Sequence, residues 1–228
     1  IIPDIGYNLE RISIAEKGLV KVAIRSRGKS AHGSTPEKGV NAVWKLIDFL
    51  NKLRDYRIPV EPQPLFTPPS LNLGVIRGGD APNMVPSSAE ALLDIRFLPG
   101  MDPRKIMAGL EALARETMAH DPESKLECEM LEKHEPTQLP GDHPLISLLQ
   151  AKARAVANKE ARLTGLSGIT VTKQLLAGGV MAVGFAPGGA DVAHIANEWV
   201  SLAELVLFGR IMGAVALDYF SLGEVSAS

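Results

Sequence analysis

Leu19-Val-Lys-Val-Ala-Ile-Arg-Ser26 is the stretch of sequence that decides the fold. Branched residues stand at every second position from residue 20 to 24 and alternate with mostly polar ones, a period of two that predicts a β-strand with one buried face. A turn-rich loop over residues 27–38 follows, and apolar residues then recur at helical spacing from 40 to 53. The sequence therefore predicts a strand, a loop and a helix in that order.

The next elements extend this order. A loop with five prolines, residues 59–69, follows the helix. Strands are predicted over residues 70–76 and 89–97, a helix from the Asp102-Pro103 pair to about His120, and a strand over residues 125–132. The order β-α-β-β-α-β, over residues 18–133, is that of a ferredoxin-like domain. Such a domain leaves sheet edges free, so we expect a homodimer through an edge strand or the first helix.

The remaining residues, 1–17 and 134–228, show a different pattern. A helix is predicted over residues 143–159 and a short apolar strand over 182–185, and a last helix begins at Ser201, where Glu204 completes a capping box. These elements hold too few strands for a sheet of their own. We therefore expect two pieces of one incomplete α/β domain into which the ferredoxin-like domain is inserted, an α/β (α+β) fold. The opening Ile-Ile-Pro-Asp reads like the middle of a larger protein.

Composition narrows the class of protein. The chain has 228 residues and a formal net charge of −2, without a long basic run, so we do not expect a nucleic-acid partner. The longest apolar stretch, residues 175–189, is rich in glycine and too short to span a bilayer, so no membrane partner is expected either. Cys128 is the only cysteine, which rules out an internal disulfide and fits a cytoplasmic protein. Its alternation with charged residues predicts a packed strand position.

Two loops carry histidines in a glycine-rich setting. Residues 187–198 place His194 after the apolar strand and before the last helix, where α/β folds bind ligands, and Glu198 could orient it. Residues 28–42 place His32 among small residues that can approach a ligand closely. Imidazole is a common metal ligand, but either histidine could instead bond to backbone in an ordinary loop. The spacing alone leaves both interpretations open.

A third segment pairs a glycine-rich loop with an arginine in a strand. Residues 74–86 contain Asn83, and Asp94 and Arg96 follow on one face of the next strand. A surface salt bridge between Asp94 and Arg96 is one interpretation. A guanidinium that binds a substrate carboxylate is the other, because its planar fork suits bidentate contacts.

Together, in this order and spacing, the three segments resemble the zinc aminopeptidase-like amidohydrolases, a family that includes acetylornithine deacetylase, succinyl-diaminopimelate desuccinylase, aminoacylase and the glutamate carboxypeptidases. Residues 28–42 are similar to the start of that family's dimerisation domain, residues 74–96 to its asparagine and aspartate-isoleucine-arginine signatures, and residues 187–198 to its closing motif. The resemblance covers nearly the whole chain, as a C-terminal portion of the family.

The resemblance implies a metal site. His194 matches the last zinc ligand, and Asp4 matches the carboxylate ligand just before the dimerisation domain. The complete family site holds two zinc ions, with cobalt or manganese as alternatives. Residues 1–17 and 134–228 would then belong to the catalytic domain and residues 18–133 to the dimerisation domain.

The resemblance also implies residues that contact substrate. His32 matches a histidine that reaches across the dimer and stabilises the oxyanion in the partner's site. Asn83 and Arg96 match residues that hold carboxylate or carbonyl oxygens, and Gly188 matches a loop near the bound substrate. The substrates would be small N-acyl amino acids or peptides, cleaved at an amide bond.

Three departures from the family pattern limit this interpretation, of which the first is that residues 139–168 fit the family poorly in detail. The family's histidine-x-aspartate motif, bridging aspartate and general-base glutamate lie upstream of Ile1, so we expect this chain to be inactive alone. A family segment glycine-threonine-aspartate-alanine-arginine stands here at residues 169–173, with Val171 in place of the aspartate and Lys173 in place of the arginine. The alternative function is therefore a non-catalytic dimerising pseudo-enzyme or fragment that acts through its interface.

Overall fold

The computed structural model describes residues 1–4, 6–193 and 195–225. The chain forms two compact units. The four-stranded unit comprises Gly18–Gln63 and Thr67–Pro136, and the three-stranded unit comprises Ile1–Lys17, Pro64–Phe66 and the chain from Thr137 onward.

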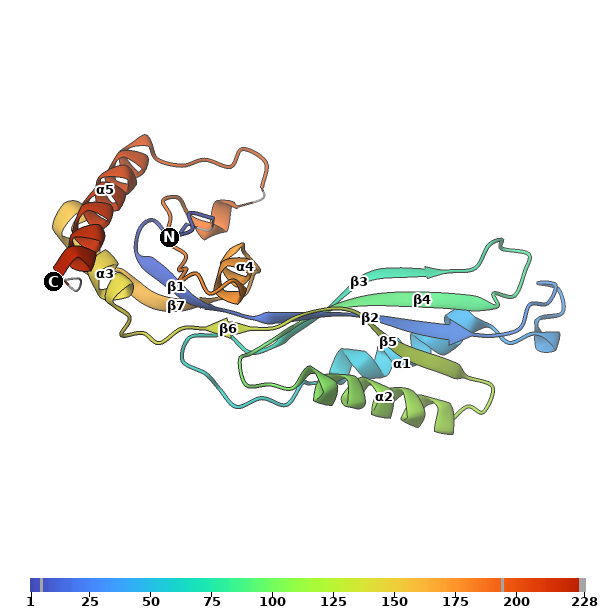
Figure 1. The fold of residues 1–228 in the computed structure, drawn as a ribbon. Helices are drawn as coiled ribbons and strands as arrows, with labels where there is room; N and C mark the ends of the chain where they lie inside the picture. Colours follow the sequence, from blue (N-terminus) through green and yellow to red (C-terminus); the bar gives the residue numbers. More distant parts are fainter. Residues whose placement is uncertain (5, 194, 226–228) are drawn as a thin grey trace. The chain divides into compact units, whose positions relative to one another are not determined.

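The four-stranded unit is an antiparallel sheet with two helices on one face (Figure 1). Its elements are β2 (Gly18–Arg27), the 3₁₀ helix η1 (Pro36–Lys38), α1 (Ala42–Asp55), β3 (Ser70–Gly78), β4 (Ser88–Phe97), α2 (Pro103–Ala119) and β5 (Lys125–His134). The strand order is β3-β4-β2-β5, so β3 and β5 are the edges. This arrangement confirms the predicted order of strands and helices.

Side-chain caps fix where the two helices of this unit begin. The Asn41 side chain accepts hydrogen bonds from the N–H groups of Val43 at 3.0 Å and Trp44 at 3.2 Å, so α1 begins at Ala42 rather than at the predicted Val40. Val40 instead pairs its backbone with Lys29. Asp102 caps α2 as predicted, accepting from the Arg104 N–H at 2.9 Å.

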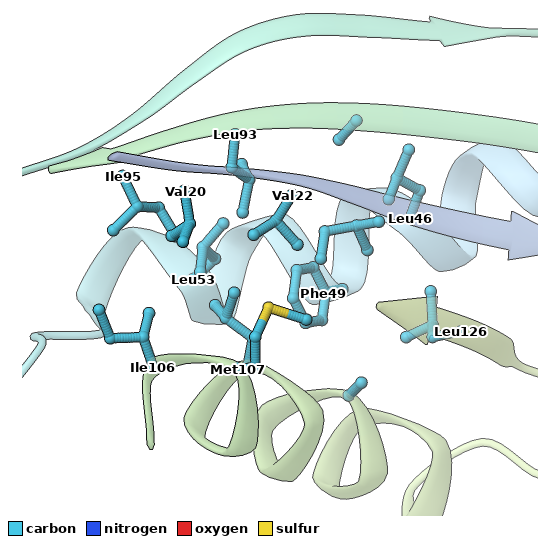
Figure 2. Close-up of a cluster of buried hydrophobic side chains, with 14 of the residues drawn as sticks. Val20, Val22, Leu46, Phe49, Leu53, Leu93, Ile95, Ile106, Met107 and Leu126 are labelled. Atoms are coloured by element: carbon cyan, nitrogen blue, oxygen red, sulfur yellow. The ribbon is translucent and has the colours of Figure 1, made fainter. Parts of the chain in front are cut away.

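The core of the four-stranded unit lies between the sheet and the helices (Figure 2). Val20 and Val22 of β2 and Leu93 and Ile95 of β4 face Phe49 of α1 and its neighbours, and all five are buried. Burial of each such side chain is worth about 1.5–3 kcal/mol relative to exposure. The alternation in β2 that predicted a half-buried strand is therefore the alternation that builds this core.

The other face of the same sheet carries paired charges. Lys21 of β2 lies 2.6 Å from Glu132 of β5, and Arg25 bonds to Glu129 of β5 and, at 2.9 Å, to Glu90 of β4. These side chains are between about a third and a half exposed. Each such pair adds little stability because water screens it.

The three-stranded unit is built around a short mixed sheet. Its elements are β1 (Arg11–Glu16), β6 (Thr137–Gln138), α3 (Pro144–Ala157), β7 (Arg162–Leu166), α4 (Thr172–Ala177), the 3₁₀ helix η2 (Ala190–Val192) and α5 (Leu202–Val225). The order is β6-β1-β7, with β1 parallel to β7. The strand predicted over residues 182–185 is wrong as a strand, because Gly184 makes only single bridges, to Ile2 and Ser13.

Helix α5 packs against α3 and is apolar on most of its surface. Ile211 is fully buried, whereas Leu202, Leu217 and Phe220 are 79%, 73% and 74% exposed. A helix that is apolar all round is usually covered on all sides. No helix among the described residues is long and apolar enough to cross a membrane.

The start of α5 departs from the predicted capping box. The Glu204 N–H donates to the Ser201 hydroxyl at 3.5 Å, which is the expected first half. The Glu204 carboxylate, however, accepts from the Gly188 N–H at 3.0 Å instead of returning to Ser201. The prediction that the Glu204 carboxylate bonds back to the Ser201 N–H is therefore wrong, because the carboxylate accepts from the backbone of Gly188.

Candidate functional site

The His32 loop and the Asn83 loop meet at one end of the four-stranded sheet. The Gly33 N–H donates to the Asn83 carbonyl at 2.8 Å, and the Val85 N–H donates to the Ala31 carbonyl at 2.9 Å. A Cβ atom at Gly33 would lie 3.0 Å from the Asn83 backbone, so a larger residue there would push the two loops apart by a few tenths of an ångström. The structure therefore brings together two of the residues that the sequence singled out.

His32 is exposed and has a defined hydrogen-bond pattern. Its Nδ1 accepts from the Ser34 N–H at 3.2 Å and lies 2.7 Å from the Ser34 hydroxyl. A neutral imidazole that accepts through Nδ1 carries its proton on Nε2. The ring therefore offers Nε2–H as a donor to an oxygen atom outside its own loop.

Arg96 lies toward the other end of the same sheet. Its Nε donates to Asp94 Oδ1 at 2.7 Å and its Nη2 donates to Asp94 Oδ2 at 3.0 Å. The bidentate salt bridge is thus the arrangement in this structure, and both side chains are half-buried. Asp94 occupies only Nε and Nη2, so the fork keeps the Nη1 donors for another carboxylate.

The length of β4 separates these groups. Asn83 precedes the first residue of the strand, Ser88, and Arg96 lies eight residues after Ser88. At 3.4 Å per residue that is about 27 Å. A small substrate that contacts His32 or Asn83 therefore cannot also contact Arg96 of the same chain.

Asp4 lies in the three-stranded unit, beside a small cavity. The cavity is lined by Ile2, Asp4, Tyr7, Ser13, Glu16, Leu166, Thr170 and Gly184. The Ile2 N–H donates to the Val183 carbonyl at 2.8 Å and the Phe185 N–H donates to the Ile2 carbonyl at 3.1 Å, which anchors the segment before Asp4. Asp4 itself is exposed at this cavity.

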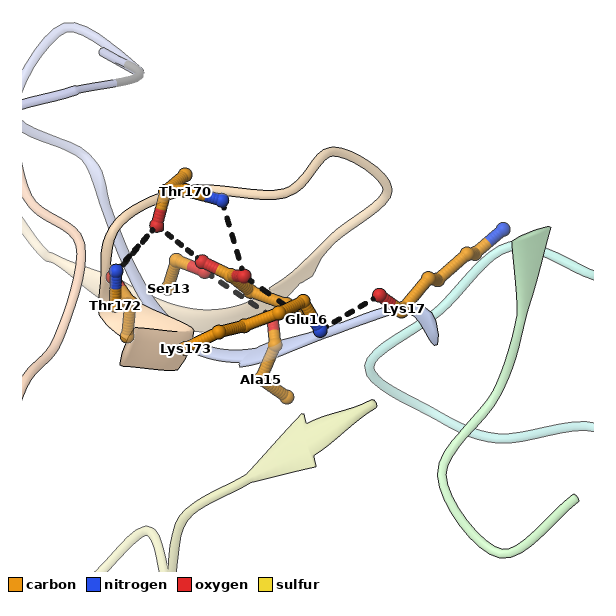
Figure 3. Close-up of polar contacts among 7 residues, drawn as sticks. All are labelled: Ser13, Ala15, Glu16, Lys17, Thr170, Thr172 and Lys173. Atoms are coloured by element: carbon orange, nitrogen blue, oxygen red, sulfur yellow. Dashed lines mark hydrogen bonds and ion pairs between the residues drawn. The ribbon is translucent and has the colours of Figure 1, made fainter. Parts of the chain in front are cut away.

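A buried polar network forms one wall of the cavity (Figure 3). Glu16, 2% exposed, accepts from the Thr170 N–H at 3.2 Å and from the Thr170 hydroxyl. The Lys173 ammonium donates to the Lys17 carbonyl at 2.9 Å and lies 3.8 Å from Glu16. Glu16 was not predicted from the sequence; its only signal is a charge directly after the apolar run at 12–15.

Lys173 therefore has a structural role that the sequence comparison did not reveal. Lys173 stands where the resembling family has an arginine. In the structure Lys173 is 9% exposed and its ammonium is engaged by Glu16 and the backbone. Val171, in place of the family's aspartate, is 49% exposed.

The predicted closing loop can be placed in part. Gly188 adopts φ +83°, a left-handed conformation that favours glycine, and its N–H is taken by Glu204. His194 lies outside the described residues. Among the residues that the structure does describe, no three His, Cys, Asp or Glu side chains come together to hold a metal ion. Asp4 alone does not fit a zinc centre, which needs three or four ligands.

Comparison with known proteins bears on these positions. Residues 14–122 match a family model described as a peptidase dimerisation domain. These residues belong to that family. The dimerisation domain covers most of the four-stranded unit, including His32, Asn83 and Arg96.

Curated relatives extend the likeness over nearly the whole chain. An acetylornithine deacetylase from Proteus mirabilis is 32% identical over 221 residues, and one from Myxococcus xanthus is 29% identical over 215. Each match covers 92% of this chain, and 54% and 55% of those proteins respectively. The chain thus spans about half the length of these relatives, in their C-terminal portion. This confirms the predicted family resemblance.

Solved structures share the fold. A tripeptidase from Staphylococcus aureus superimposes with a TM-score of 0.74 at 18% identity, covering 93% of this chain and 54% of that one. A metallo-carboxypeptidase from Sulfolobus solfataricus gives a TM-score of 0.68 at 17% identity, with 92% and 61% covered. These two peptidases therefore share the fold of this chain.

Proposed function

We propose that this chain is part of a metal-dependent amidohydrolase that cleaves small N-acyl amino acids or peptides, with substrate bound by groups from two subunits. The observation that carries the proposal is the separation along β4. His32 and Asn83 lie at one end of the sheet and Arg96 toward the other, about 27 Å apart by strand length. A site that uses both sets needs two chains.

The chemistry follows from the donors on each side. The His32 Nε2–H would donate to the oxyanion that forms when the amide carbonyl is attacked, and Asn83 beside it would donate an amide N–H. Arg96, oriented by Asp94 at 2.7 Å, would bind the substrate carboxylate with its remaining N–H groups. Asp4, Gly188 and His194 enter the proposal through the family resemblance, as do two zinc ions. Since Asp4 alone does not form a zinc site, no step is assigned to metal here.

A homodimer through the four-stranded unit is part of the proposal. The edge strand β3 has an unpaired backbone side and carries Leu73, 42% exposed, and Ile76, 51% exposed. Trp44 on the neighbouring helix α1 is 63% exposed. Large apolar side chains beside an open sheet edge favour an interface between copies.

We also propose that residues 1–17 and 134–228 are parts of one catalytic domain and residues 18–133 the inserted dimerisation domain, in a cytoplasmic enzyme. The exposed apolar side chains of α5 support this, since they need more protein to cover them. The family's general base lies outside this chain, so the chain alone is expected not to hydrolyse amides.

Subunit mixing tests the shared site. The variants H32A and R96A are made in the full-length product of the gene, assayed on a panel of N-acyl amino acids, and then mixed under conditions that exchange subunits. Each alone should lose at least about 100-fold in activity. The mixture should regain about one quarter of wild-type activity, because each mixed dimer has one intact site. Mixing without recovery would show that one chain supplies both residues.

A non-catalytic dimeric protein is the second candidate, favoured by Val171 and the engaged Lys173. It predicts a full-length product that dimerises but hydrolyses none of the panel with zinc, cobalt or manganese added.

A further inference from the structure

Two arginines lie side by side in the three-stranded unit without a carboxylate of their own. Arg11 begins β1 and Arg162 begins β7, and the two are direct partners across this parallel strand pair. Partner residues on neighbouring strands point to the same face of a sheet, so the two guanidinium groups are neighbours. Both residues are exposed. Like charges in this position repel each other.

The nearby carboxylates are already engaged. Glu10 lies 2.6 Å from Lys159, and Glu160 lies 3.3 Å from Arg154. The Lys159 hydrogen bond and charge, followed by the charges of the two arginines, lower the pKa of Glu10. Within the described part of the chain, neither Arg11 nor Arg162 makes an ion pair within 4.0 Å. The region therefore holds more positive than negative charge.

A hollow of about 630 Å³ opens at this place. Arg11, Arg162 and Lys159 line it together with the neutral side chains of Asn158, Leu163 and Thr164 and the carboxylates of Glu10 and Glu160. Arg11 is held over the Tyr7 ring, with its guanidinium carbon 4.9 Å from the ring centre, so part of its freedom is already lost before any ligand binds. A ligand of small-molecule size fits a hollow of this volume.

Three features oppose an anion here: the carboxylates of Glu10 and Glu160, which are paired with Lys159 and Arg154, and the end of α3. Helix α3 ends at Ala157, and the negative end of its dipole points toward the hollow. That end is equivalent to about half a negative charge, and the Asn158 and Lys159 N–H groups already bond its last carbonyls. Two full guanidinium charges exceed it.

We propose that Arg11 and Arg162 form a binding site for a tetrahedral oxyanion of the phosphate type, free or as a phosphate monoester. Two guanidinium forks on one face match the oxygen pairs of such an anion. Lys159 also lines the hollow, but Glu10 balances its charge, so the two arginines supply the excess. The site is independent of the proposed hydrolase activity.

The experiment titrates the 228-residue chain with inorganic phosphate against chloride at equal ionic strength. The readouts are the melting temperature and the amide NMR shifts of Arg11, Lys159 and Arg162. Both readouts should change with phosphate concentration and reach a plateau. The melting temperature should rise by about 3–5 °C at ten times the dissociation constant of phosphate. Sulfate, of the same shape and charge, should act alike, and glycerol phosphate tests the monoester.

Variants separate binding from a general salt effect, because phosphate and sulfate stabilise most proteins without binding. R11Q/R162Q should lose the saturable shift, and R11K/R162K should weaken it about tenfold through loss of the fork. The control R54Q/R115Q removes two exposed arginines from the other unit and should respond like wild type. An equal, non-saturating rise in melting temperature in all variants would overturn the proposal. The two arginines would then only balance the negative end of the α3 dipole.

Discussion

In the four-stranded unit charged side chains lie on the open face of the sheet and apolar ones under the helices, whereas the three-stranded unit buries an ion pair and exposes apolar side chains of α5. Lys21 and Glu132 are 49% and 39% exposed, while Lys173 and Glu16 are 9% and 3% exposed. The first unit buries its apolar core under the helices and keeps its ion pairs exposed, although Trp44, Leu73 and Ile76 are 63%, 42% and 51% exposed. The second places charge inside and leaves Phe220 74% exposed. The burial of charge is therefore what distinguishes the two units.

The largest expected effect is in the core of the four-stranded unit. Phe49→Ala removes a fully buried ring that packs between sheet and helices, and should cost about 3–5 kcal/mol. Urea unfolding followed by hydrogen exchange, read separately for peptides of each unit, measures the loss. Leu149→Ala, in the core of the three-stranded unit, is the matched control. If each variant lowers the unfolding free energy of both units equally, the two units unfold together, and they do not differ in stability.

The second effect tests the buried ion pair. Lys173→Met leaves Glu16 charged, buried and without its cation, and should destabilise the chain by about 3–5 kcal/mol. The double variant E16L/K173M should recover much of that loss, because the desolvation cost disappears with both charges. Denaturant midpoints measure both.

The control for this prediction lies in the other unit. Lys21→Met breaks an exposed pair and should change stability by at most about 1 kcal/mol. A loss at Lys21 as large as that at Lys173 would show that burial does not distinguish the two pairs.

The smallest effect concerns Cys128, whose thiol is half-buried on β5. Burial, with a contribution from Glu111, raises its pKa to about 11. At pH 8 its reaction with iodoacetamide should therefore be about a hundredfold slower than that of a free cysteine. Unfolding in urea should restore the ordinary rate, and mass spectrometry follows both.

The same pKa has a consequence for stability. Since the folded state holds the thiol proton more tightly than the unfolded state, this stabilisation is complete below pH 9 and is lost as the pH rises toward 11. Cys128→Val should flatten that decline. An unchanged slope would mean that other groups cause it.

Most of the four-stranded unit could be predicted because its signals are local. Alternation marked β2, and the Asp102-Pro103 pair marked the start of α2. The exception is the start of α1, where the Asn41 cap replaced Val40 as the boundary. The sequence could not decide whether Arg96 forms a salt bridge with Asp94 or binds a substrate carboxylate, because Asp94 lies close to Arg96 in either case.

The three-stranded unit was harder because its decisive contacts join distant segments. Glu16 meets Thr170 across 154 residues, and no local pattern relates them. Strand β1 alternates polar and apolar residues only over Arg11–Ile14, too short a run to predict a strand, and its burial from Ile12 to Glu16 depends on contacts with distant segments. Asp4 and Gly188 could be named only through the family resemblance, and the structure leaves their roles as proposals.

The separation along β4 also limits how this protein can change. A strand has fixed rise, so each pair of residues inserted into β4 would move Arg96 about 7 Å from the His32 end, and a single residue would turn it to the opposite face. Substitutions on the open face alter only one side chain. The length of β4 is therefore under tighter constraint than its surface composition, because it sets the spacing between the two halves of the proposed site.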